Sequence, residues 1–138
     1  NAAHSAQYPE HVSKHGWFAS PDNCAFDPSG RLWIATDQGR DWRKTGFADG
    51  LWACGTDTNG QTTIKRFFRA PAGAEVCGPE FTPDGRTLFL AVQHPGVDGI
   101  NGASYEAPGT RWPDFQEGTP PRPSVVVITR RDGGEIGI

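Results

Sequence analysis

An internal repeat constrains the fold of this chain more than any other feature of its sequence. The run CAFDPSGRLWIA at residues 24–35 returns, with one inserted residue, as PEFTPDGRTLFLA at residues 79–91. The two copies lie about 55 residues apart, a spacing typical of propellers and solenoids. We therefore expect consecutive, similarly built units rather than one irregular domain.

Each copy of the repeat has the pattern of a β-hairpin. Pro28-Ser29-Gly30 and Pro83-Asp84-Gly85 each combine a fixed φ, a turn-forming side chain and a residue that tolerates positive φ. The apolar runs at 32–35 and 88–92 follow these turns. Such unbroken apolar runs predict strands that are buried on both faces.

Further apolar stretches complete two units of four strands. Residues 50–54 and 62–68 are the expected third and fourth strands of the first unit. Residues 124–129 are the third strand of the second unit, and 135–138 are expected to begin its fourth. The 18 glycines and 12 prolines favour short strands joined by turns over long helices.

We predict an all-β fold made of about two four-stranded antiparallel blades of a β-propeller. One blade spans 20–72, and a second, incomplete blade spans 74–138 within a partial propeller of residues 17–138. Residues 1–16 are interpreted as a leader or linker, with Asn1-Ala2 a candidate tag scar. Two blades cannot close a ring, so their exposed apolar faces predict a marginal fold or a homo-oligomer.

Charge and composition exclude several classes of function. The net charge is −3 without a basic stripe, which argues against nucleic-acid binding. No apolar run approaches the roughly 20 residues of a membrane span. The three cysteines form no CxxC pair, so free thiols are expected rather than a structural zinc site.

Two long loops are expected to emerge at one end of the blades. They run over 37–49 and 93–123. In a meander the second strand returns to the end where the first began, so both loops lie beside 20–23 and 73–76. Long loops of this kind are commonly functional.

Asp22 and Glu75 occupy equivalent positions just before the first strand of each unit, and Asn23 adds an amide oxygen. Carboxylates from successive blades would converge on the central channel, where oxygen ligands suit Ca²⁺ and also iron when other ligands are added. A local Asx turn for Asp22-Asn23 and a solvated carboxylate for Glu75 are the alternatives.

Basic and imidazole side chains on the loops supply the remaining candidates. Lys44 and Arg111 could contact an anionic substrate. The alternative is that both are charged loop residues exposed to solvent. His94 lies where a strand leaves toward the same end. No nucleophile elbow, P-loop or HExxH motif is present, so no catalytic residue is assigned.

The chain resembles the C-terminal half of PhoX-type alkaline phosphatases from about Trp17 onward. The similar segments are long and specific: 20–23, 26–37, 73–89, 92–96, 110–113 and 121–126. A generic propeller would match only the Pro-x-Gly-Arg turns.

The resemblance implies a fragment of a secreted or periplasmic phosphomonoesterase, a hydrolase on a six-bladed propeller. It also implies iron and calcium in the central channel, with Glu75 as a metal ligand and Asp22 and Asn23 as further candidates. Most ligands would lie outside this chain, so we expect the fragment to be inactive and to bind metal weakly or not at all. The alternatives are a lactonase-like propeller hydrolase that uses calcium and a non-catalytic propeller scaffold.

Overall fold

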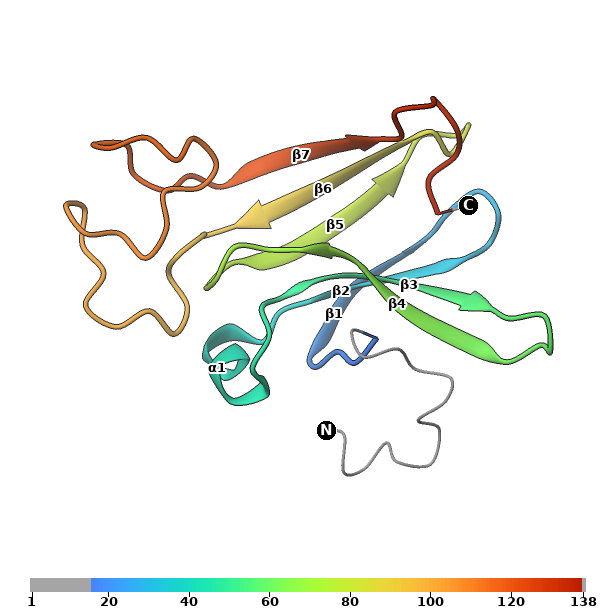
Figure 1. The fold of residues 1–138 in the computed structure, drawn as a ribbon, viewed down its shortest axis with the longest axis horizontal. Coiled ribbons are helices and arrows are strands. Elements are labelled where there is room, and N and C mark those ends of the chain that lie inside the picture. Colours follow the sequence, from blue (N-terminus) through green and yellow to red (C-terminus); the bar gives the residue numbers. More distant parts are fainter. Residues whose placement is uncertain (1–15, 138) are drawn as a thin grey trace.

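The chain forms two antiparallel sheets that face each other (Figure 1), as seen in a computed structural model that describes residues 16–137. The first sheet has the order β1-β2-β3-β4 and the second has the order β5-β6-β7. The first contains β1 (Pro21–Phe26), β2 (Leu32–Thr36), β3 (Gly50–Thr56) and β4 (Thr62–Arg69). The second contains β5 (Glu75–Phe81), β6 (Thr87–Gln93) and β7 (Ser124–Thr129). The all-β meander expected from the repeat is confirmed.

The repeated turns form because an aspartate closes each of them. Asp27 Oδ1 accepts hydrogen bonds from the backbone N–H groups of Ser29 and Arg31, at 3.0 and 2.9 Å. In the second copy, Asp84 Oδ1 accepts from the N–H of Arg86 at 3.1 Å. Both turns then use a glycine at positive φ, which favours a residue without a Cβ atom.

The core lies between the two sheets. Its largest fully buried apolar side chains come from both: Trp33, Leu51, Val76, Leu88, Leu90 and Val92. Trp33 of β2 packs against Phe81 of β5 with ring centroids 5.1 Å apart. The alternation of buried and exposed positions along β6 shows that only one face of this strand is covered.

Burial of the repeated strands on both faces is therefore a wrong prediction for β6, because Phe89 points away from the core and is 39% exposed. The unbroken apolar run at 88–92 has the sequence pattern of a strand that is buried on both faces. The sequence pattern alone does not show whether a second layer lies over the outer face.

The segment after β7 also differs from the prediction. Residues 135–137 form no strand, and Ile138 lies outside the described residues. Instead, the N–H of Ile136 donates to the carbonyl of Gly85 at 2.8 Å, and the Ile136 side chain is buried in the core. Burying this isoleucine between the sheets stabilises a turn at the expense of strand pairing.

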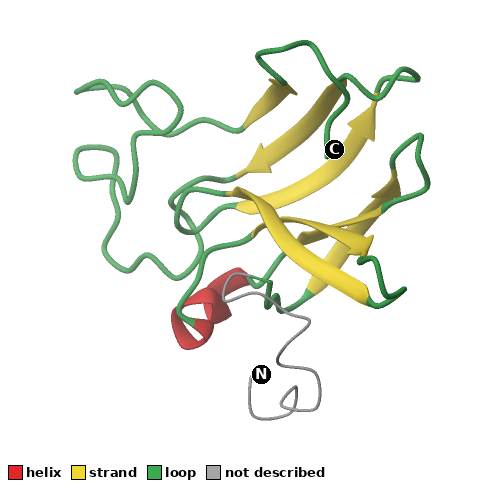
Figure 2. Ribbon diagram, turned by 45° about the vertical axis from the view of Figure 1, so that its right-hand side comes forward, coloured by secondary structure: helices red, strands yellow, loops and turns green. Residues whose placement is uncertain are grey.

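The two long loops lie at the opposite end of the sheets from the hairpin turns (Figures 1 and 2). The first contains a short 3-10 turn (Gly39–Asp41) and the helix α1 (Trp42–Thr45), which the sequence did not indicate. The second, residues 94–123, contains neither helix nor strand. Trp42 Nε1 donates to the carbonyl of Asp98 at 2.8 Å, which confirms that both loops emerge at the same end.

Candidate functional site

Glu75 begins β5 because the residues before it fix the start of the strand. The N–H of Ala74 donates to the carbonyl of Pro71 at 3.2 Å, and Gly73 between them has a φ of 70°. Ala74 and Val76, on either side of Glu75, are both buried in the core. The Glu75 side chain must therefore point to the other face of the strand.

Both carboxylate oxygens of Glu75 have neighbours from the end of β6. Gln93 Nε2 donates to Oε1 at 3.0 Å, and His94 Nε2 lies 3.3 Å from Oε2. The side chain is 14% exposed. Burial raises the pKa of Glu75, the His94 contact opposes this, and Asp37 and Asp22 add repulsion that raises the pKa further.

His94 occupies a strained position between two carboxylates. Its φ is 33°, which is unusual for a residue with a Cβ atom. Its Nδ1 lies 3.7 Å from Asp98 Oδ2, is buried, and makes no hydrogen bond within residues 16–137. Burial lowers the pKa of His94, but the Glu75 hydrogen bond and the Asp98 charge outweigh burial, so that the net pKa is raised.

Asn23 connects the first sheet to this site. Its Oδ1 accepts a hydrogen bond from the N–H of Gly78 in β5 at 3.0 Å, and its Nδ2 donates to Asp22 Oδ2 at 2.5 Å. The structure thus places Asp22 close enough for its charge to raise the pKa of Glu75, and it places Asn23 against Gly78, the fourth residue of β5. β1 and β5 are in contact along this edge.

Sequence reasoning missed Asp37 and Gln93, which both influence Glu75. They occupy equivalent positions of the repeat at the end of the second strand of each unit: Asp37 directly follows β2, and Gln93 is the last residue of β6. Asp37 raises the pKa of Glu75 through its charge, and Gln93 donates a hydrogen bond to it. Extending the alignment of the two copies by two residues past the apolar runs would have found them.

The oxygen-rich side chains of this end fit part of a hard-cation site. Carboxylates and amide oxygens are the ligands that Ca²⁺ prefers, and imidazole is added in iron sites. Within the described part of the chain, however, no three His, Cys, Asp or Glu residues are grouped closely enough to hold a metal alone. Additional ligands would be required from outside these residues.

Lys44 and Arg111 do not join this group in the described residues. Lys44 Nζ pairs with Asp41 Oδ1 at 2.8 Å, and both side chains are exposed. Arg111 donates to the carbonyls of Thr119 and Glu106, both at 3.1 Å, and so supports the shape of its own loop. Substrate contact by either residue stays a prediction.

The three cysteines are free thiols. Cys24 is exposed, whereas Cys54 and Cys77 are partly buried. Burial raises the pKa of Cys54 and Cys77, which keeps these thiols protonated and poorly nucleophilic at neutral pH. The sulfur of Cys77 accepts a hydrogen bond from Gln93 at 3.0 Å.

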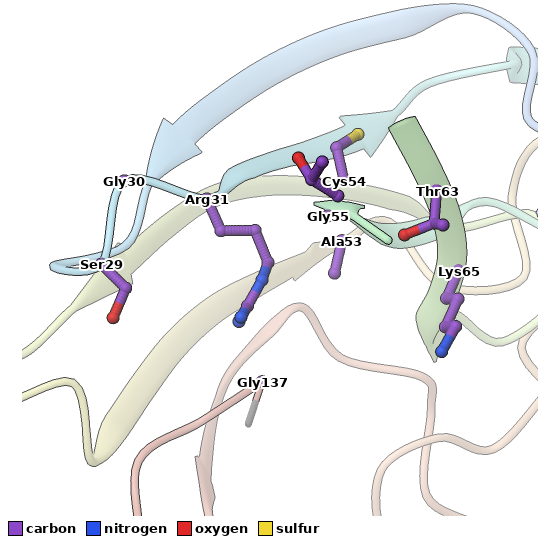
Figure 3. Close-up of a pocket in the computed structure, with 10 residues that line it drawn as sticks. Ser29, Gly30, Arg31, Ala53, Cys54, Gly55, Thr63, Lys65 and Gly137 are labelled. Carbon is purple, nitrogen blue, oxygen red and sulfur yellow. The ribbon is translucent and has the colours of Figure 1, made fainter. Parts of the chain in front are cut away.

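A cavity of about 430 Å³ lies at the hairpin-turn end of the first sheet, away from Glu75 (Figure 3). Arg31 before β2 and Lys65 of β4 are its charged lining residues. Asp27 already pairs with Arg31 at 3.2 Å. The lining residues include no carboxylate, so this cavity lacks the ligands that calcium prefers.

Among residues 16–137, no helix is both long enough and apolar enough to cross a bilayer.

Comparison with known proteins identifies the family. A family model described as alkaline phosphatase PhoX matches residues 1–96. The solved structure of Pseudomonas fluorescens PhoX in complex with vanadate, a transition state analogue, is similar with a TM-score of 0.72 and 36% sequence identity. The similarity covers 93% of this chain but 20% of that chain, and no curated protein matches significantly. The chain therefore belongs to the PhoX alkaline phosphatase family, of which it spans about a fifth of one solved member's length.

Proposed function

We propose that this chain is a C-terminal part of a secreted, metal-dependent phosphomonoesterase, and that it contributes Glu75 as a metal ligand. The observation that carries the proposal is the placement of Glu75, a mostly shielded carboxylate that Gln93 and His94 hold at a strand end. Orientation of a ligand by such hydrogen-bonding partners is the usual construction of a protein metal site. Asp22 and Asn23 are the next candidate ligands because they lie at the adjacent strand end.

Family membership favours phosphate ester hydrolysis over the lactonase and scaffold alternatives. The similar solved structure is described in complex with vanadate, a transition state analogue. Calcium and iron, when bound, would bind the phosphate group and stabilise the charge of the transition state. Glu75, Asp22 and Asn23 would bind and orient the cations, and His94 would keep Glu75 in place.

The isolated chain is expected to be inactive as a phosphatase. It spans about a fifth of the solved relative, and residues 16–137 group too few donors to hold a metal alone. Substrate and metal would therefore meet an incomplete site. A chromogenic phosphate ester should be hydrolysed by the longer protein and not by the 138-residue chain, whereas robust turnover by the purified chain would contradict this.

Substitution of Glu75 tests its role in the longer protein. Glu75→Gln keeps the size of the side chain but removes its charge, so we expect kcat/KM for the phosphate ester to fall about 100-fold and bound calcium to decrease. Glu80→Gln is the matched control, because Glu80 lies exposed on the same strand. Unchanged activity and metal content in Glu75→Gln would exclude the ligand role, and hydrolysis of a lactone instead of the phosphate ester would favour the lactonase alternative.

A further inference from the structure

The indole of Trp42 connects the two long loops. Trp42 of α1 donates its Nε1–H to the carbonyl of Asp98 at 2.8 Å, across 56 residues of sequence. Gly99 lies against the same ring: a Cβ atom there would lie 3.0 Å from the indole nitrogen and 3.2 Å from Arg43 Cδ. The contact is therefore close-packed as well as hydrogen-bonded, and Arg43 stacks over the indole.

The loop segment 94–98 that Trp42 contacts is also packed on the residues just before Glu75. The N–H groups of Gly96 and Asp98 donate to the carbonyls of Ala72 and Gly73, at 3.0 and 3.1 Å. A Cβ atom on Gly73 would lie 2.7 Å from the carbonyl oxygen of Asp98. Displacement of segment 94–98 would therefore disturb the start of β5.

The same segment carries the histidine that contacts Glu75. Asp98 Oδ2 lies 3.7 Å from His94 Nδ1, and His94 Nε2 lies 3.3 Å from Glu75 Oε2. His94 has a φ of 33°, and a conformation of this kind persists only where the surrounding structure imposes it. The contacts thus form a continuous path from Trp42 through Asp98 and His94 to Glu75.

We propose that Trp42 is a positioning residue that holds segment 94–98 in place, so that His94 keeps the Glu75 carboxylate oriented. The significance for metal binding rests on the proposed ligand role of Glu75. Loss of a partner that orients a ligand typically lowers metal affinity 10- to 100-fold. Trp42 acts through other residues and does not itself contact Glu75 in the described structure.

Two substitutions disturb this contact from opposite sides. Trp42→Phe removes the N–H donor while keeping an aromatic ring. Gly99→Ala introduces a Cβ atom that would crowd the indole, at a φ of 65° that itself disfavours a side chain. Tyr105→Phe is the matched control, because it removes an exposed hydroxyl that donates to Gly118 in the same loop. Amide hydrogen exchange at Val97 and Asp98 reports on segment 94–98.

We expect exchange at these two amides to rise about fivefold or more in Trp42→Phe and Gly99→Ala, and to stay unchanged in Tyr105→Phe. Unchanged exchange in both test variants would overturn the proposal. Calorimetric titration of the longer protein with calcium should give about tenfold weaker binding in both test variants than in the control.

Faster exchange with unaltered calcium affinity would also overturn the positioning role. If calcium binds neither the unsubstituted longer protein nor its variants, the metal-ligand role of Glu75 is not supported. The amide-exchange comparison then decides by itself whether Trp42 holds the segment.

Discussion

Asp49 closes the base of the loop that carries Asp37 and Trp42. It is buried, and its Oδ1 accepts hydrogen bonds from Thr36 Oγ1 at 2.6 Å and from the N–H of Gln38 at 3.0 Å. Burial raises the pKa of Asp49, although these hydrogen bonds oppose the increase. The network defines where the loop leaves β2 and re-enters β3.

The raised pKa makes the stability contribution of Asp49 depend on pH. The folded state retains its proton at a pH where the unfolded state has lost it, so the contribution falls as pH rises above about 4. Asp49→Asn keeps an acceptor oxygen but cannot ionise. Its free energy of unfolding should therefore increase relative to that of the unsubstituted chain between about pH 4 and pH 7.

Denaturant unfolding at several pH values measures this difference. Asp49→Ala serves as the contrasting variant, because it removes the acceptor and should cost about 1–3 kcal/mol throughout the range. A pH-independent difference between Asp49→Asn and the unsubstituted chain would contradict the assignment.

At the level of the elements, the two copies of the repeat differ in what their turn aspartates hold. Asp27 is buried and, besides closing its turn, accepts from Trp33 Nε1 at 3.0 Å and pairs with Arg31. Asp84 is exposed and bonds within its own turn, to Thr82 and Arg86. The two aspartates occupy equivalent positions of the repeat but therefore contribute differently to the stability of the fold.

Substitution of these two aspartates should lower the free energy of unfolding by different amounts. Asp27→Ala leaves the buried indole N–H of Trp33 without its acceptor, so we expect a loss of about 2–4 kcal/mol in the free energy of unfolding. Asp84→Ala is the matched control and should cost less, because water replaces its partner. Equal losses in thermal or denaturant unfolding would contradict this reading of the two turns.

For the whole molecule, the outer face of the second sheet is an exposed apolar surface. Val125 and Val127 of β7 are 65% and 59% exposed, and they pair with Ala91 and Phe89 of β6. In the longer protein we expect further chain to cover this face. In the isolated chain we expect it to act as a surface for self-association.

We therefore predict that the isolated chain self-associates and that Val125→Thr with Val127→Thr weakens the association about tenfold or more. Threonine keeps the β-branched shape but reduces the apolar area. Val97→Thr is the control, because Val97 is similarly exposed but lies in a loop. Sedimentation of the unsubstituted chain as a monomer at high concentration would contradict the prediction.

Much of the fold could be predicted from local sequence patterns. The turn residues and apolar runs placed β2, β3, β4, β6 and β7 close to their observed bounds, and the family was recognisable from its long motifs. The segment after β7 was not predictable, because Ile136 is buried by side chains from distant segments. The burial of Phe89 was also predicted wrongly, because the sequence does not show whether another layer covers the outer face of β6.

The sequence by itself determined the strands, their hairpins and the positions of Asp22, Asn23 and Glu75 at the strand ends, because period-two alternation and turn chemistry act over a few neighbouring residues. Only the tertiary structure decided which side chains meet Glu75. The contacts of Gln93 and His94 with Glu75, the charge of Asp37 and the link from Trp42 to Asp98 join residues 18 to 56 positions apart or different sheets. Such contacts depend on how the sheets and loops pack, which no local pattern encodes.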